Sequence, residues 1–381
     1  MPFPDWVEAQ KKQGYEIKKI GDGYYMYERK SRWDKDKKKP VKVTGEYIGV
    51  VTPEGIIPRK KRYDDTIPIF TIEYGATAFI KNIARDILKS LCDHFEKNTA
   101  QMIWVISMLR LIAPSPFQMI EERYQTSWMS KILPDLLLSK SSITDLIDRV
   151  GSNRASCAAF MRDTLPSAPY MLIDRSIAKS ESEFISRVLP NFNKSKKYLP
   201  QINQIYLVAV SESGDGMPGF YRNVADNMPD ISAFELTLED AGLEMRVILT
   251  DNGVALAGNF EGPEYLEPHL KYAYQTYKNR SKTELLFETL CDIGEQDAWY
   301  VQDNVGFEAW TFLGHVTMMC AFRILALLRE RNLFEDWTLE GLLNHLSGIH
   351  KVLVANEWRT AETTEKTQEL ISSLSFDLNQ T

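Results

Sequence analysis

The chain has 381 residues, of which 44% are hydrophobic and 25% are charged. These proportions are those of a soluble globular protein with room for two domains, and they exclude a disordered or low-complexity chain. The N-terminal stretch is polar, and the most apolar stretch, residues 316–328, is too short to cross a membrane and contains Arg323. We therefore expect a cytoplasmic protein that does not enter a membrane.

The cysteines and histidines do not have the spacing of a metal site. The four cysteines are far apart and form no Cys-x-x-Cys pair, which excludes a zinc ribbon or a disulfide framework. The five histidines also lack metal-ligand spacing, and we interpret them as structural.

Positive charge is concentrated near the N-terminus. Residues 1–65 contain 16 Lys and Arg and 11 Asp and Glu, a net charge of +5, whereas the whole chain has a net charge of −7. Two basic clusters flank the strand-like segment 41–51, and tyrosines and a tryptophan lie among them. Cations and aromatic rings on a hairpin are typical of a surface that binds a phosphate backbone. The predicted DNA-binding residues of this basic β-hairpin region, residues 1–70, are Arg29, Lys30, Lys37, Lys38, Lys39, Arg59, Lys60, Lys61 and Arg62. The alternative, a solvated hairpin whose lysines protect an edge strand, stays open.

Residues 71–165 are predicted to form a helical DNA-binding domain. Apolar residues keep helical spacing from residue 75 to residue 160, and residues 99–113 are apolar enough to form a buried helix. Ser142 is the predicted N-cap of a short helix that ends near Gly151. A second helix at 153–165 would complete a helix-turn-helix.

The pattern changes to strands near residue 169. The predicted order is β-β-β-α-β, with strands at 170–174, 204–213, 217–225 and 245–253, a turn at 214–216 and a helix at 230–242. No strand is expected between Asp251 and Glu284. The rest of the chain is predicted to be helical, at about 264–297, 305–331, 338–356 and 363–375.

Three carboxylates occupy special places in this order. Asp174 ends the first predicted strand and Asp251 ends the fourth, so the two converge if these strands are neighbours. Glu284 lies on one stripe of the predicted helix 277–291 with Tyr277 and Arg280. Taken alone, Arg280 and Glu284 could be an ordinary solvated pair. Three converging carboxylates, however, need a divalent cation to neutralise them, and oxygen ligands favour Mg²⁺ or Mn²⁺.

These residues resemble a known family. Residues 277–291, "YKNRSKTELLFETLC", are similar to the Tyr-x2-Arg-x3-Glu-x6-Lys signature of DDE transposases of the insertion sequence 4 branch. The segments "LIDRS" at 172–176 and "LTDNGV" at 249–254 resemble those around the first and second aspartates of the family. The segment "YRNVADNMPD" resembles its Gly-Asn-x-x-Asp turn region, with Asn227 and Asp230 retained.

The resemblance implies an α/β fold, a ribonuclease H-like mixed sheet (β-β-β-α-β-α) flanked by helices, in a catalytic domain at residues 166–381. It implies a transposase of an insertion sequence that cleaves DNA and transfers strands at the element ends. Asp174, Asp251 and Glu284 would be the catalytic ligands of two Mg²⁺ or Mn²⁺ ions, and Tyr277 and Arg280 would contact DNA. The implied partners are the terminal inverted repeats and target DNA, with a homodimer in the DNA complex, in a prokaryotic cytoplasm and associated with the nucleoid.

Two departures from the family pattern define an alternative. Cys291 stands where the family has a lysine, and the interval between Asp251 and Glu284 is short. A catalytically inactive, internally shortened remnant that only binds DNA is therefore the alternative. A helical scaffold protein that does not bind DNA is a third possibility.

Overall fold

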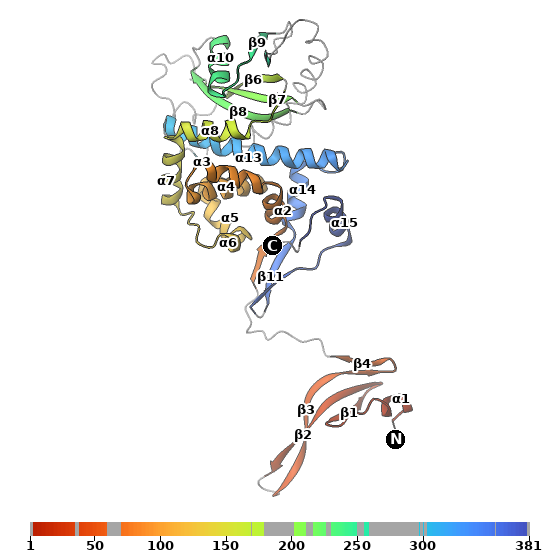
Figure 1. Ribbon diagram of the computed structural model, residues 1–381. Coiled ribbons are helices and arrows are strands. Elements are labelled where there is room, and N and C mark those ends of the chain that lie inside the picture. Colours follow the sequence, from red (N-terminus) through yellow and green to blue (C-terminus); the bar gives the residue numbers. More distant parts are fainter. Residues whose placement is uncertain are drawn as a thin grey trace. The chain divides into compact units, whose positions relative to one another are not determined.

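The computed structural model describes residues 3–34, 38–58, 70–168, 170–178, 202–210, 216–225, 230–249, 255–258, 297, 300, 303–354 and 356–378 (Figure 1). The chain forms two compact units, Met1–Pro68 and Ile69–Thr381. The predicted boundary between residues 165 and 166 lies inside the second unit.

The first unit is an antiparallel sheet with one short helix. Its strands follow the order β1-β2-β3-β4. A tight turn at Gly21, whose φ of 61° suits glycine, joins the first two strands. The small core contains Val7, Met26 and Val51, each at most 3% exposed. The elements are α1 (Asp5–Glu8), β1 (Tyr15–Ile20), β2 (Gly23–Asp34), β3 (Lys39–Thr52) and β4 (Gly55–Pro58). The predicted hairpin is β2–β3, and β1 and β4 extend it to four strands.

The second unit contains a helical core around two buried helices, α4 and α13. Both helices are apolar on nearly all sides because other helices surround them, and α13 packs against α4, α7, α2 and α14. The predicted buried helix at 99–113 is confirmed as α4. The helices of this core are α2 (Gly75–Ile83), α3 (Arg85–His94), α4 (Lys97–Ile112), η1 (Phe117–Met119), α5 (Ile120–Thr126), α6 (Met129–Ile132), α7 (Lys140–Gly151), α8 (Arg154–Thr164), α13 (Asn304–Glu330), α14 (Leu339–Ser347) and α15 (Glu365–Ser373).

Helices α7 and α8 are the predicted helix pair, but α7 begins earlier than expected. Ser139, not Ser142, is its N-cap, and the Ser139 side chain accepts a hydrogen bond from the Ser142 backbone N–H. Ser139, Ser141 and Ser142 are all candidate caps, but only Ser139 precedes the helix, so Ser142 lies inside the first turn. Asn153 caps α8 by accepting from the backbone N–H of Ser156.

A five-stranded sheet packs against α8 and α13 through β8 (Figure 1). Its strands are β6 (Tyr170–Ala178), β7 (Ile202–Val210), β8 (Gly216–Ala225), β9 (Arg246–Leu249) and β10 (Ala255–Gly258), and α10 (Asp230–Asp240) packs against β7, β8 and β9. The order is β8-β7-β6-β10-β9. The predicted order β-β-β-α-β is present in the chain, whereas the turn at 214–216 lies largely outside the described residues.

The sheet differs from the expectation in two respects. Every described pair of neighbouring strands is antiparallel, whereas a mixed sheet was predicted. In addition, β10 lies in the interval after Asp251, where no strand was expected. Its four residues, Ala255–Gly258, are too short and too rich in small residues to show a strand pattern by themselves. Pairing on both sides, with β6 and β9, makes this segment a strand.

The predicted helix 338–356 was wrong in its second half. α14 ends at Ser347, and β11 (His350–Val354) and β12 (Glu357–Thr360) follow as a hairpin that pairs with β5 (Phe70–Glu73). The hairpin turn contains Asn356 with a φ of 67°. Lys351 of β11 stabilises the packing of the hairpin, because its Nζ lies 4.2 Å from the ring centroids of both Tyr74 and Trp128 and forms cation–π contacts with them.

A buried histidine in α13 predicts a dependence of stability on pH. His315 is 0% exposed, neither ring nitrogen has a hydrogen-bond partner among the described residues, and its ring lies 5.5 Å from that of Tyr221. Burial lowers the pKa of His315 from 6.5 to about 3, and the charge of Arg154 adds to this. Because the folded-state pKa is below the unfolded one, the contribution of this group is complete above about pH 6.5 and is lost as the pH falls.

We expect the free energy of unfolding to fall by about 2 kcal/mol between pH 7.5 and pH 5 through this group alone. Urea unfolding at the two pH values, on the wild type and on His315→Leu, measures this difference. The variant should lose that part of the pH dependence, and the control variant His350→Gln, at a half-buried position on β11, should retain it. An equal pH dependence in His315→Leu and the wild type would contradict the prediction.

Candidate functional site

Asp174 alone among the three predicted metal ligands lies within the described residues. It lies on β6, the central strand of the five-stranded sheet, directly after the buried Ile173. Its backbone pairs with Tyr206 of β7. The sequence predicted that Asp174 ends its strand, but β6 continues to Ala178 because residues 175–178 pair with residues 202–205 of β7.

The other predicted catalytic and DNA-contacting residues lie outside the described residues. These are Asp251, Tyr277, Arg280 and Glu284. In the described part of the chain, no group of three or more His, Cys, Asp and Glu side chains could hold a metal ion. The metal centre therefore stays a prediction.

The order of the strands separates β6 from β9, the strand that ends two residues before Asp251. The sequence predicted that Asp174 and Asp251 converge if β6 and β9 are neighbouring strands. Instead, β10 lies between β6 and β9 and pairs with both. A short connection after Leu249 favours pairing of β9 with β10, since antiparallel strands can be joined by a tight turn. The register aligns Ile173, Ala255 and Leu249 across the sheet, so Leu249 is two strand spacings, roughly 10 Å, from Ile173. β6 and β9 nevertheless run in the same direction, which places their carboxyl ends at the same edge.

A network of polar side chains joins this sheet to the helices. Glu308 of α13 accepts hydrogen bonds from Arg154 Nη1 at 2.8 Å, from the Tyr221 hydroxyl at 2.7 Å and from Asn223 Nδ2 at 2.8 Å. The Nη2 atom of Arg154 also donates to Asp240 of α10 at 3.0 Å. Residues from α8, β8, α10 and α13 are thereby connected.

The network stabilises the packing of the sheet on the helices, and its one hydroxyl, that of Tyr221, is buried and hydrogen-bonded to Glu308. Burial opposes the charge of Arg154, yet Tyr221, Glu308 and Asp240 together raise its pKa. Burial also raises the pKa of Tyr221 well above its ordinary value, and the nearby charge of Glu308 adds to this effect. Both carboxylate oxygens of Glu308 are satisfied by donors, so this group stabilises the packing of β8 on α13. Sequence reasoning missed the network because its members are far apart in the chain.

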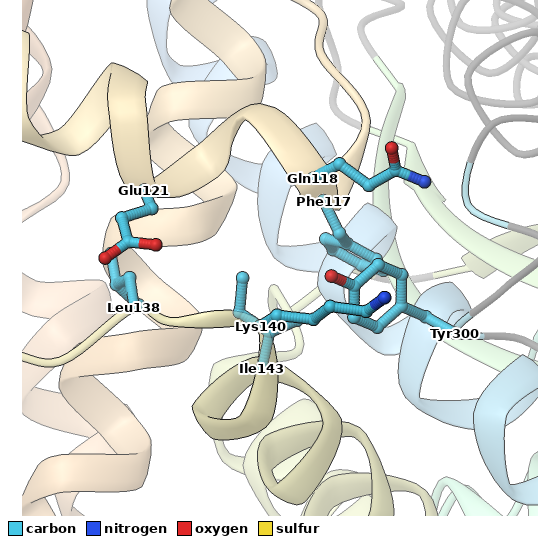
Figure 2. A pocket seen from close by; sticks show the side chains of 7 residues that line it. All are labelled: Phe117, Gln118, Glu121, Leu138, Lys140, Ile143 and Tyr300. Atoms are coloured by element: carbon cyan, nitrogen blue, oxygen red, sulfur yellow. The ribbon is translucent and has the colours of Figure 1, made fainter.

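One pocket of about 320 Å³ opens between η1, α5 and the start of α7. Figure 2 shows the rings of Phe117 and Tyr300 at one end and Glu121 at the other. The two rings make an edge contact with centroids 5.5 Å apart. The remaining lining residues are Gln118, Leu138, Lys140 and Ile143. The lining combines one carboxylate and one amine with apolar side chains, and it contains no serine, cysteine or histidine for nucleophilic catalysis.

The first unit presents a face of aromatic and cationic side chains. The tyrosine rings pack together, with centroids 5.4 Å apart for Tyr27 and Tyr47 and 6.1 Å apart for Tyr25 and Tyr47. Lys18 Nζ lies 5.4 Å from the Tyr27 centroid. Lys18 and Lys42 both form ion pairs with Glu16, and these pairs lower the pKa of Glu16. The face therefore combines packed rings with exposed amines.

Four of the nine cations predicted to bind DNA are described, and all four are exposed. They are Arg29, Lys30, Lys38 and Lys39. Lys37, Arg59, Lys60, Lys61 and Arg62 lie outside the described residues. Sequence reasoning did not single out Lys18 and Lys42, although both share the aromatic face. The strand period of two could have found them, because Lys18 pairs directly with Tyr25, and Lys42 is two residues from Thr44.

No protein-family model, no curated protein and no solved structure matches the chain.

Proposed function

We propose that the protein is a DNA transposase of the insertion-sequence type, which cleaves DNA and transfers strands at the ends of its element. The observation that carries the proposal is the signature Tyr277-x2-Arg280-x3-Glu284 together with Asp174 and Asp251 after apolar strand segments. The order β6, β7, β8, α10, β9 supports it, since this is the order in which a ribonuclease H-like core presents its first two carboxylates. Asp174 on the central strand of the sheet also supports it.

The donor set fits a pair of hard divalent cations. Asp174, Asp251 and Glu284 supply only carboxylate oxygens, which Mg²⁺ and Mn²⁺ prefer. Such ions, when bound, activate a water or 3′-hydroxyl and stabilise the leaving oxygen. If the segment is helical, Tyr277 lies about two turns and Arg280 about one turn before Glu284. Both would clamp the phosphates and hold the strand in line for attack.

A second candidate function is DNA binding without cleavage. The observation that favours it is the position of β10, which separates β6 from β9 and so keeps the ends of these two strands from being direct neighbours. Together with the short interval between Asp251 and Glu284, this is consistent with an internally shortened remnant.

Binding of Mn²⁺ distinguishes the two candidates. A cation that binds only the folded state raises the melting temperature. At a free cation concentration of 100 times the dissociation constant, the folded state is stabilised by about 2.7 kcal/mol. We expect a Mn²⁺-dependent rise for the wild type and for the exposed control variant Glu335→Gln, but not for Asp174→Asn. A rise of the same size in Asp174→Asn would contradict the proposed ligand set, and no rise in the wild type would favour the remnant.

A further inference from the structure

The hairpin of the first unit continues beyond its neighbouring strands as a two-stranded arm. The pairing of β1 with β2 ends at Glu28, and β4 pairs only with residues 49–52 of β3. Residues 29–34 of β2 and 39–44 of β3, which we call the β2–β3 arm, therefore pair only with each other among the described strands. Its six residue pairs span about 20 Å at about 3.3 Å per residue. The arm is visible in Figure 1 as the free end of β2 and β3.

The two faces of the arm differ in chemistry. Directly paired residues of an antiparallel ladder share a face, and the pairs Arg29 with Thr44 and Ser31 with Lys42 alternate with the others. These four side chains carry a guanidinium, an amine and two hydroxyls, all of which can donate hydrogen bonds. The same alternation puts the exposed Trp33, paired with Pro40, on this face, which we call the donor face. The opposite face carries Lys30 paired with Val43, which is 42% exposed, and the register also assigns the pairs Arg32 with Val41 and Asp34 with Lys39 to it.

The donor face is also the open face of the whole sheet. It continues into Tyr27, Tyr47 and Lys18, and Lys18 is hydrogen-bonded to Thr44. The opposite face is covered at its base by α1, where the rings of Trp6 and Tyr24 lie 5.3 Å apart. Glu16 lies on the open side, but its side chain is only 12% exposed and it is paired with two lysines. The charge that this face presents is therefore positive.

We infer that the β2–β3 arm enters the major groove of duplex DNA with its donor face toward the DNA, an inference that rests on the DNA-binding part of the proposed function. The major groove is wide enough for a two-stranded β-ribbon, and the bases and phosphates offer acceptors to the guanidinium, amine and hydroxyls of this face. Arg29 and Lys42 contribute the charge, and Ser31 and Thr44 the neutral donors. Lys30, although adjacent to Arg29 in sequence, faces away from the DNA.

Two charge-matched double variants test which face is used. Arg29→Gln with Lys42→Gln removes two cations from the donor face, and Lys30→Gln with Lys39→Gln removes two from the opposite face. Each pair also breaks one ion pair, of Lys42 with Glu16 or of Lys30 with Glu28. Binding of the full chain to an arbitrary 30-base-pair duplex is measured by fluorescence anisotropy from 50 to 200 mM salt. Equal melting temperatures show that both variants are folded.

We expect the donor-face variant to bind at least about tenfold more weakly at 50 mM salt, and its log–log salt slope to fall by about 2. The inference revises the prediction that Lys30 and Lys39 contact DNA, because the register places both on the face away from the groove. The opposite-face variant should therefore stay within about threefold of the wild type. Methyl green, which occupies the major groove, should displace the protein, and netropsin, which occupies the minor groove, should not. Equal losses in the two variants, or displacement by netropsin alone, would overturn the inference and leave DNA binding intact. No binding by the wild type would overturn both.

Discussion

Replacing Asp297 by alanine is expected to lower the free energy of unfolding by about 3–5 kcal/mol, because it leaves a buried guanidinium without its partner. Asp297 is 0% exposed, and its Oδ2 accepts from Arg110 Nη2 at 2.8 Å, where Arg110 is itself 2% exposed. Its two oxygens also accept from the Phe117 backbone N–H at 2.7 Å and from Trp310 Nε1 at 3.2 Å. The carboxylate therefore connects α4, η1 and α13, and all three donors lose their acceptor in the variant.

Chemical denaturation followed by circular dichroism measures this loss. The control is Asp303→Ala, which removes only the N-cap of α13 and should cost about 1 kcal/mol. In the double variant Arg110→Met with Asp297→Leu, no charge remains buried without a partner, and most of the stability should return. A loss below about 1 kcal/mol in Asp297→Ala, or a double variant less stable than Asp297→Ala, would contradict this account of the ion pair.

The sequence predicted the elements whose pattern is local. α4 and α13 are long and apolar, and β6, β7 and β8 are apolar runs of strand length, so periodicity and length identified them. The β2–β3 hairpin was likewise predicted from the strand-like segment 41–51 and the basic clusters and aromatic residues around it. In each case the signal lies within the segment itself.

The elements that the sequence missed depend on partners far away in the chain. β11 is a strand because it pairs with β5, so that His350 lies opposite Glu73. The segment 350–354 follows a helix and is short, and nothing within it distinguishes a strand from the end of that helix. β10 is a strand for the same reason, since it pairs with both β6 and β9. Pairing of this kind overrides local propensity.

In the candidate site, too, the features with a local sequence pattern were predicted and those that depend on distant residues were not. Asp174 was identified from its place at the end of an apolar strand segment and from a family motif, and the structure places it on the central strand of the sheet. Strand order could not be predicted, because it depends on whether β9 pairs with β6 or with β10. The partners of Glu308, Arg154 and Tyr221, are 154 and 87 residues away in sequence, so no spacing pattern reveals them.

Catalysis by the three carboxylates predicts a large effect of one substitution. Glu284→Gln keeps the size of the side chain but removes one negative charge from the proposed metal ligands. Stabilisation of the transition state by metal ions amounts to several kcal/mol, which corresponds to on the order of 1000-fold in rate. We expect the wild type to nick DNA weakly, and faster with Mn²⁺ than with Mg²⁺. The prediction concerns nicking and does not require full strand transfer. In Glu284→Gln, nicking should fall to the level of a sample without protein.

Nicking of a supercoiled plasmid tests the proposed function most directly. The plasmid carries the ends of the protein's own element and is incubated with wild type, Glu284→Gln or the exposed control Glu335→Gln, with Mg²⁺, Mn²⁺ or EDTA. The proposed transposase predicts metal-dependent nicking by the wild type and by Glu335→Gln, and none above background by Glu284→Gln. Equal nicking by Glu284→Gln and the wild type, or no nicking by the wild type with either metal, would contradict it.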